Sequence, residues 1–459
     1  MQQVLLRIPL KVDWLPVPLW LLLLVAFLLA AAALYGGARF APRWKLDPKA
    51  VQSAAVWVAV AGLIVCGLSY FFAKDGLPIY GFGMMLFLAF VICNWLAGRR
   101  AVSEGVPKEA VQDLAIWLIV GGLIGARLTS FLSSPHPPTN LADFLYQFIR
   151  IWDGGIVLYG AVIGGALSYI AAYFLVFRKQ GLSTLKLADV IAPSLAVGLC
   201  LGRIGCFLNG CCYGQVACTD CPVYAVSFPL SAPPRYDLVN KGYQTAAGFT
   251  LAEEKSIGLD AALVGRVQPG SAADRAGLKI GDEILEVDGA PLSGDGARYG
   301  KLGPADNLDQ YLGNFGEWPR GKNDLTLTVQ TGADAPRTLT LQPWTLGLHP
   351  TQVYESISMI LLFLLLTAYF PFRRHDGQVM ALLMICYAAH RYLNELLRAD
   401  ERPEGFESWT SVILLVAGVA LWIWLQRRPA QYRFQAKELT AASQGKATPA
   451  SHALRGAGL

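Results

Sequence analysis

The chain has little charge for its length. Only 15% of its 459 residues are Asp, Glu, Lys or Arg, whereas a soluble protein of this size carries about a quarter. Apolar residues make up 54% of the sequence and gather in blocks of about twenty, the length that crosses a bilayer. The shortage of charge therefore excludes a soluble globular protein and predicts a membrane protein with several spans.

Histidine is scarce as well. The chain has only five histidines and no H-E-x-x-H sequence, the motif by which zinc metalloproteases hold their metal. This absence excludes an intramembrane metalloprotease.

The apolar blocks predict an α-helical polytopic protein with about nine spans. We expect them at residues 17–38, 52–73, 80–97, 110–131, 155–177, 188–209, 351–371, 377–397 and 408–426. Every second linker is rich in Lys and Arg, and such linkers lie in the cytoplasm. The pattern predicts that the N-terminus lies outside and the C-terminus inside. The first block is also compatible with a signal peptide.

One hydrophilic segment, residues 213–348, separates the sixth and seventh blocks and is here called the insert. The alternation of linkers places it on the extracytoplasmic side. Its glycine pattern, Gly277-Leu278, Gly281-Asp282 and Val287-Asp288-Gly289, resembles that of a PDZ domain of the bacterial protease-associated type. We expect a small β-barrel over 256–345, with a strand at 263–267, a helix near 305–312 and a closing hairpin turned at 331–336.

The resemblance to PDZ domains implies that the insert binds an extended peptide by strand addition. The loop that would receive the peptide carboxylate contains Ile257, Gly258 and Leu259. The peptide would belong to an exported polypeptide, either a substrate or a partner. The alternative is a spacer without a ligand.

Several ionisable residues interrupt the apolar blocks, where their cost makes a functional role the first hypothesis. Arg127, Arg203 and Arg391 would form a pocket for a lipid phosphate, because guanidinium binds phosphate through two hydrogen bonds. Glu395 follows Arg391 by four residues and would pair with an arginine on the same helix face. Glu355, at the start of the seventh block, could equally pair with one of the arginines.

Five stretches then occur in an order that is similar to the prolipoprotein diacylglyceryl transferase family. They are "IYGFGMM", "IWDGGIVLYGAVIGG", "GRIGCFLNGCCYG", "HPTQVYE" and "RYLNELLR". The resemblance covers residues 78–214 and 347–426, and it implies a multi-pass protein of the bacterial inner membrane. It implies transfer of the diacylglyceryl group of phosphatidylglycerol to a cysteine thiol of an exported prolipoprotein, with release of glycerol 1-phosphate. It implies no metal and no cofactor, and nothing in it points to nucleic acid.

The motifs and the buried arginines together give the candidate site. The residues expected at the reaction are Arg203, Arg391, Glu395, Tyr80 and Tyr159. Those expected to contact substrate are Arg127, Asn209, Gly214, Gly154, Gly155, Gly160, His349 and His390. The sequence departs from the family pattern at Cys206 and Cys211, which replace an asparagine and an acidic residue, and at Tyr159, which replaces a histidine.

Cysteines cluster after the sixth block. In an oxidising compartment, Cys211, Cys212, Cys218 and Cys221 would form two disulfides, with the adjacent pair bonded to different partners. The C-x-x-C spacing of Cys218 and Cys221 leaves redox chemistry or a metal site as alternatives. Two other classes therefore stay open: a membrane thiol-redox protein and a non-catalytic anchor for a PDZ adaptor.

The expected organisation has six parts. They are two additional transmembrane helices (1–77), the first part of the transferase-like membrane domain (78–214), a cysteine-containing extracytoplasmic linker (215–255), the PDZ-like domain (256–345), the second part of the membrane domain (346–428) and a disordered cytoplasmic tail (429–459).

Overall fold

The structure is a computed structural model. It describes residues 4–8, 19–37, parts of 51–67, 77–132, 140–149, 158–217, 225–252, 261–294, 296–299, 302–314, 318, 322–400 and 406–431. The chain divides into two compact units. One, here the helical unit, contains residues 86–204 and 351–459, and the other, here the mixed unit, contains residues 1–85 and 205–350.

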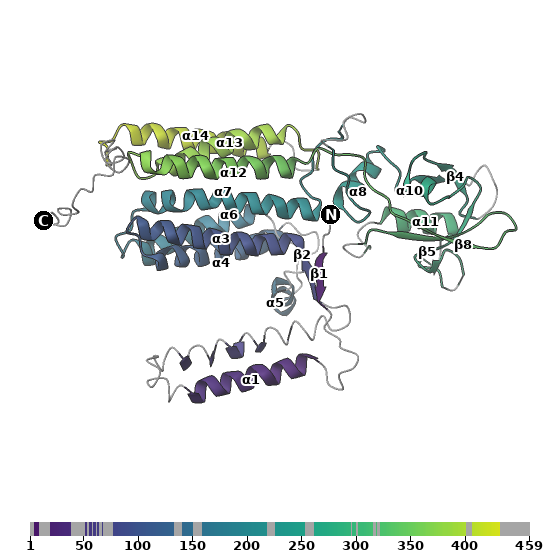
Figure 1. Ribbon diagram of the computed structural model, residues 1–459, viewed down its shortest axis with the longest axis horizontal. Helices are drawn as coiled ribbons and strands as arrows, with labels where there is room; N and C mark the ends of the chain where they lie inside the picture. The colour runs from purple at the N-terminus through teal and green to yellow at the C-terminus, as the bar shows by residue number, and fades with distance from the viewer. Residues whose placement is uncertain are drawn as a thin grey trace, which may run out of the picture. The chain divides into compact units, whose positions relative to one another are not determined.

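The helical unit consists mainly of long helices, which Figure 1 draws as coiled ribbons. The elements are α3 (Gly81–Ser103), α4 (Lys108–Leu132), α5 (Leu141–Ile149), α6 (Leu158–Ala172) with its π-helical continuation η3 (Tyr173–Phe177), α7 (Thr184–Asn209), α12 (Thr351–Tyr369) with the 3₁₀ turn η6 (Phe370–Phe372), α13 (Gln378–Glu395) and α14 (Phe406–Gln426).

Within the described residues, six helices are long and apolar enough to cross a membrane. They are α3, α4, α6 with η3, α7, α12 and α14, and they confirm the polytopic membrane class. The count of nine is not confirmed. The block expected at 377–397 forms α13, which is not among the six, and the block at 17–38 forms α1 (Leu19–Gly37) with a shorter apolar stretch. The block at 52–73 is described only in fragments.

Glycines set the distance between α4 and α6. A Cβ atom added at Gly164 would lie 2.2 Å from the carbonyl oxygen of Gly121, and one at Gly125 would lie 2.2 Å from that of Gly160. The two helices therefore pack backbone against backbone, as helices with small residues do in membranes.

A buried ionic cluster joins the turn after α3, helix α7 and the turn before α13. Asp189, 1% exposed, accepts hydrogen bonds from the backbone N–H groups of Gly377 (2.8 Å) and Met380 (2.9 Å). Arg373 lies 3.9 Å from Asp189 and pairs with Glu104. The carboxylate of Asp189 thus binds N–H groups at the start of α13 and holds that end of the helix against α7.

The mixed unit contains short N-terminal elements and the insert. β1 (Val4–Ile8) pairs antiparallel with β2 (Leu77–Tyr80), directly before α3. The insert consists of α8 (Pro233–Asn240), β3 (Phe249–Leu251), β4 (Val264–Val267), α10 (Ala272–Arg275), β5 (Glu283–Val287), β6 (Ala290–Pro291), α11 (Pro304–Gly313), β7 (Leu325–Gln330) and β8 (Arg337–Leu341).

Two antiparallel sheets build the insert, one of β3 and β4 and one in the order β6-β5-β7-β8. The alternating sequence of β7 buries Leu325, Leu327 and Val329 and turns the threonines between them away from the core. α11 adds Leu308, Tyr311 and Leu312 to the same core.

The elements expected in the insert are present. The expected strand at 263–267 is β4, the expected helix is α11, and the expected hairpin is β7 and β8, turned at 331–336. The core reaches further toward the N-terminus than the expected boundary at 256, because Leu230, Ala247 and Phe249 belong to it. Ile257, Gly258 and Leu259 lie outside the described residues.

Candidate active site

A buried ion pair joins two helices of the helical unit. Arg203, near the C-terminal end of α7, places Nε 2.9 Å from Oε1 of Glu355, which lies in the first turns of α12. The Glu355 side chain is fully buried, and its other oxygen accepts a hydrogen bond of 2.9 Å from Nδ2 of Asn394 on α13. The consecutive helices α12 and α13 therefore meet α7, which is distant from them in sequence, at one carboxylate.

α13 presents further polar groups beside this pair. Tyr387, His390, Arg391 and Asn394 recur at helical spacing and so share one face. Arg203 forms a hydrogen bond with Tyr387, and the charges of Glu355, Arg203 and Arg391 act on both Tyr387 and His390.

His390 and Glu395 differ in their surroundings. Nε2 of His390 is buried and has no hydrogen-bond partner in the part of the chain that the structure describes. Arg391 places Nη2 3.3 Å from Oε2 of Glu395, so Glu395 pairs with the arginine one turn before it, as its spacing predicted.

The free-energy cost of burying the Glu355 carboxylate explains why its partners are held in place. A carboxylate removed from water is retained only when charge and hydrogen bonds compensate it, and removing one partner of such a pair costs about 3–5 kcal/mol. Glu355 therefore fixes the position of the Arg203 guanidinium. A fixed guanidinium is suited to bind phosphate through two parallel hydrogen bonds.

The other expected arginine makes different contacts. Arg127, 6% exposed, donates from Nη2 to the carbonyl oxygen of Gln147 at 2.5 Å, and its guanidinium lies 5.4 Å from the ring centre of Phe131. These contacts dock α5 on α4 within the helical unit. A direct role at the substrate stays a prediction for this residue.

Four expected residues belong to the mixed unit. Tyr80 ends β2 and is 38% exposed. Asn209 ends α7, and the backbone N–H of Gly214 donates to the carbonyl oxygen of His349 at 2.9 Å. His349 in turn donates from its backbone N–H to Gln215 at 3.0 Å. The end of the "GRIGCFLNGCCYG" motif is therefore fastened to the start of "HPTQVYE".

The glycine-rich stretch is described in part. Gly160 packs against α4, where an added Cβ would lie 2.3 Å from the carbonyl oxygen of Gly125. This contact gives Gly160 a packing role, and its predicted contact with lipid is untested. Tyr159 lies on the first turn of α6, and Gly154 and Gly155 lie outside the described residues.

The expected disulfides also stay a prediction, because Cys218 and Cys221 lie outside the described residues. Cys211 and Cys212 are described, and their sulfur atoms lie near that of Cys206.

Sequence reasoning missed two members of the site. Asn394 was read only as part of the "RYLNELLR" motif, and Tyr387 was not singled out. Their helical spacing from Arg391 was the available signal, since residues three and four apart share a face.

The six apolar helices and the charged site buried among helices define a polytopic inner-membrane protein. The sequence profile of the prolipoprotein diacylglyceryl transferase family matches residues 69–424. The chain therefore belongs to that family.

Three relatives named phosphatidylglycerol–prolipoprotein diacylglyceryl transferase show the range of similarity. The protein of Rhodopirellula baltica is 35% identical over 215 residues, 46% of this chain and 42% of the relative. That of Clostridium tetani is 36% identical over 144 residues, 31% of this chain and 55% of the relative. That of Yersinia enterocolitica is 26% identical over 370 residues, 78% of this chain and 94% of the relative. The matched part thus spans about half the length of the first two relatives.

Proposed function

We propose that the protein transfers the diacylglyceryl group of phosphatidylglycerol to the thiol of a cysteine in an exported prolipoprotein. The observation that carries the proposal is the Arg203–Glu355–Asn394 cluster in a chain of this family. The names of the relatives indicate the donor and the acceptor.

The reaction is a displacement at a glycerol carbon. The acceptor sulfur forms a bond to that carbon, the carbon–oxygen bond to phosphate breaks, and glycerol 1-phosphate leaves with the electron pair. The thiol proton goes to a base. Negative charge grows on the leaving phosphate, and a fixed cation stabilises it more than mobile water does. Arg203 is that cation, since Glu355 already holds its guanidinium.

We assign the base to His390. Imidazole has a pKa of about 6.5 in water and accepts a proton near neutral pH. The buried Nε2 of His390 has no hydrogen-bond partner among the described residues, and the histidine shares the α13 face of Arg391. Glu395 acts differently, because it is paired with Arg391 and positions it.

We further propose that the insert is extracytoplasmic and PDZ-like, and that it captures an exported polypeptide by strand addition at the edge near residues 257–264. The support is the glycine pattern and the arrangement of β4, α10 and α11. The insert is held at both ends by bridges between Val226 and Leu348 and between Pro229 and Trp344.

The test of transfer uses the purified protein in vesicles that contain phosphatidylglycerol, with a lipobox peptide as acceptor. We expect a thioether-linked diacylglyceryl peptide and an equal amount of glycerol phosphate. A peptide with serine in place of the acceptor cysteine should give neither. Absence of both products with the cysteine peptide, under conditions in which a known member of the family is active, would overturn the proposal.

The test of capture replaces residues 230–343 by a short flexible linker. The lipobox peptide should then be modified at a near-normal rate, while a full-length exported prolipoprotein slows at subsaturating concentration, because a tethered domain raises the local concentration of what it binds. Equal rates for both acceptors would contradict capture.

A further inference from the structure

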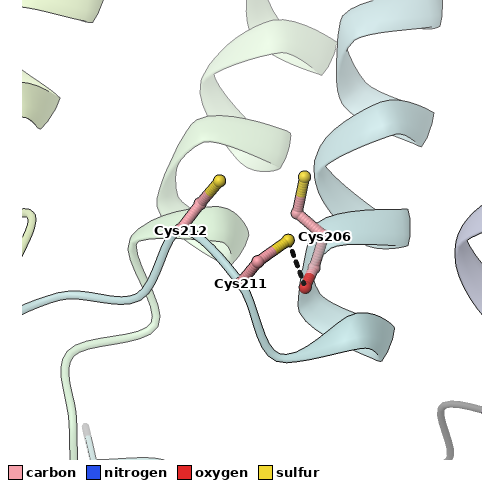
Figure 2. Close-up of side chains that lie close together, drawn as sticks. All are labelled: Cys206, Cys211 and Cys212. Carbon is pink, nitrogen blue, oxygen red and sulfur yellow. Dashed lines mark hydrogen bonds between the residues drawn. The ribbon is translucent and has the colours of Figure 1, made fainter. Parts of the chain in front are cut away.

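Three cysteine sulfurs meet at the end of α7. Cys206 lies on the last turn of the helix, and Cys211 and Cys212 lie in the turn that follows it. The three sulfur atoms are all within 4.8 Å of one another, and the three residues are half-buried. Figure 2 shows the three side chains close together. The Sγ of Cys211 also donates to the carbonyl oxygen of Cys206 at 3.7 Å.

The backbone is bent to bring these side chains together. The N–H groups of Gly210 and Cys211 both donate to the carbonyl oxygen of Cys206, at 2.9 and 3.1 Å, and Gly210 takes a φ of 79°. This is a left-handed helix end, which glycine adopts readily. Cys212 has a φ of 61°, a conformation that costs a non-glycine residue on the order of 1–3 kcal/mol and persists only when its surroundings enforce it.

Contacts beyond the turn enforce it. Gly214 bonds to the carbonyl oxygen of His349, and the buried Tyr213 bonds through its hydroxyl to the carboxylate of Asp237. Strain of this kind is found where a side chain is held for binding or chemistry. Here it is the Cys212 thiol that is held, beside the other two.

The distances suit one cation better than one disulfide. A tetrahedral cation with bonds of about 2.3 Å to sulfur separates its sulfur ligands by roughly 3.8 Å. Three thiols within 4.8 Å reach that spacing by small side-chain movements. A disulfide would use two of the three and leave the third, whereas a cation uses all of them.

We propose that Cys206, Cys211 and Cys212 form a binding site for a thiophilic cation with a filled d shell, Zn²⁺ or Cu⁺. Thiolate ligands favour these two ions over the harder Mg²⁺ and Ca²⁺. Three thiolates satisfy Cu⁺ in a trigonal arrangement and supply three of the four ligands of Zn²⁺.

The first experiment measures metal bound by the full-length protein in detergent. The protein is reduced, treated with a chelator and then given one cation, Zn²⁺ in one arm and Cu⁺ in the other. We expect about one equivalent to remain after gel filtration in at least one arm. Cys206→Ser, Cys211→Ser and Cys212→Ser should each weaken retention against a competing chelator by tenfold or more. Cys386→Ser, a half-buried thiol on α13, is the matched control and should have no effect.

The second experiment needs no variant and so does not depend on how the serine proteins fold. The unmodified protein is alkylated with and without the cation, and each cysteine is followed by mass spectrometry. Bound cation should slow the alkylation of Cys206, Cys211 and Cys212 and leave that of Cys386 unchanged.

Three results would overturn the proposal. The first is retention of neither cation above the level of the Cys206→Ser protein. The second is loss of binding in a Cys218→Ser, Cys221→Ser double variant equal to the loss in Cys206→Ser, which would place the ligands elsewhere. The third is a disulfide that contains Cys206 in protein taken from membranes without reduction.

Discussion

Glu355 in the helical unit and Asp282 in the insert are both fully buried carboxylates, and each contacts an arginine. Asp282 accepts hydrogen bonds from Thr331 at 2.5 Å, from Arg337 at 2.7 Å and from the backbone N–H of Lys279 at 2.9 Å. Glu355 contacts two side chains, Arg203 and Asn394.

The difference between the two carboxylates separates a structural role from the role that we propose at the active site. Asp282 ties the turn before β5 to the β7–β8 hairpin, and its arginine is partly exposed. Glu355 instead holds one arginine in a cluster that also contains Tyr387, His390 and Arg391, so its burial positions charged groups of other helices. A buried carboxylate surrounded by titratable groups is a candidate functional site, whereas one bound to a hairpin makes a structural contact.

The largest expected effect is on the functional carboxylate's partner. Arg203→Ala should lower the rate of transfer by about 10²–10³-fold, because it removes a fixed charge from the leaving phosphate. Arg203→Lys should recover part of the rate, since it restores charge without the planar guanidinium. The measurement is product formation in phosphatidylglycerol vesicles.

The control is Arg100→Ala, an arginine on α3 that bonds to Thr367 at 3.3 Å, and its activity should stay near normal. If Arg203→Ala keeps activity within tenfold of the unmodified protein, the Glu355–Arg203 pair is structural, as the Asp282–Arg337 pair is.

The next effect concerns the structural carboxylate. Burial tends to raise the pKa of Asp282, but hydrogen bonds from Thr331, Lys279 and Arg337 outweigh it and hold the pKa below the ordinary value of 3.8. A carboxyl whose pKa is lower when folded stabilises the fold above its unfolded pKa and loses that contribution as pH falls through its folded pKa. Asp282 therefore stabilises the insert at neutral pH, and this contribution declines as pH falls from about 4 through the lower pKa of the folded state.

Asp282→Asn should destabilise the insert by about 1–3 kcal/mol at neutral pH and leave transfer to a short peptide unchanged. Its stability should also vary less with acid than that of the unmodified protein. Hydrogen exchange of the β7 amides, corrected for the intrinsic rate at each pH, measures both. Asp334→Asn, in the exposed hairpin turn, is the control and should change stability by less than about 0.5 kcal/mol. A similar loss in both variants would contradict the assigned role.

Helix packing gives a smaller expected effect. Gly164→Ala should lower the free energy of unfolding by about 1–3 kcal/mol, because the new methyl group meets the Gly121 carbonyl oxygen and overpacks the contact. The apparent unfolding temperature should fall accordingly. Gly165→Ala is the matched control, since its methyl group would lie 3.9 Å from the nearest atom, the carbonyl oxygen of Leu118. The same shift in both proteins would show that α4 and α6 are not held by this contact.

The smallest expected effect separates a positioning group from a base. Glu395→Gln should lower transfer about threefold, or roughly 0.7 kcal/mol of barrier, and leave the shape of the pH–rate profile unchanged. His390→Gln should remove the acidic limb of the profile, because that limb reports the protonated base. A profile that loses its limb in Glu395→Gln instead would exchange the two roles.

The local elements of the insert were predictable, and so was the membrane class. Alternation of leucine and threonine specifies β7, the turn residues at 331–336 specify the hairpin, and the apolar blocks specify six helices. The N-terminal limit of the packed core of the insert, expected at residue 256, was not predictable from the sequence pattern. Leu230 and Phe249 lie in stretches without strong periodicity, and they join the core through contacts that are distant in sequence.

The candidate site also divides into features that the sequence determined and features that only the tertiary structure decided. Composition determined that this is a membrane protein, because scarce charge and apolar blocks of about twenty residues suit a bilayer and not water. The order of five motifs indicated the family. Only the tertiary structure decided that Glu355 pairs with Arg203 rather than with another arginine, and that Asn394 completes the pair. Likewise, sequence spacing grouped Cys211 and Cys212 with later cysteines, whereas the left-handed turn at Gly210 brings them to Cys206. The physical reason is that periodicity reports which side of an element is apolar, whereas pairing between elements depends on how several helices and turns fill the same space.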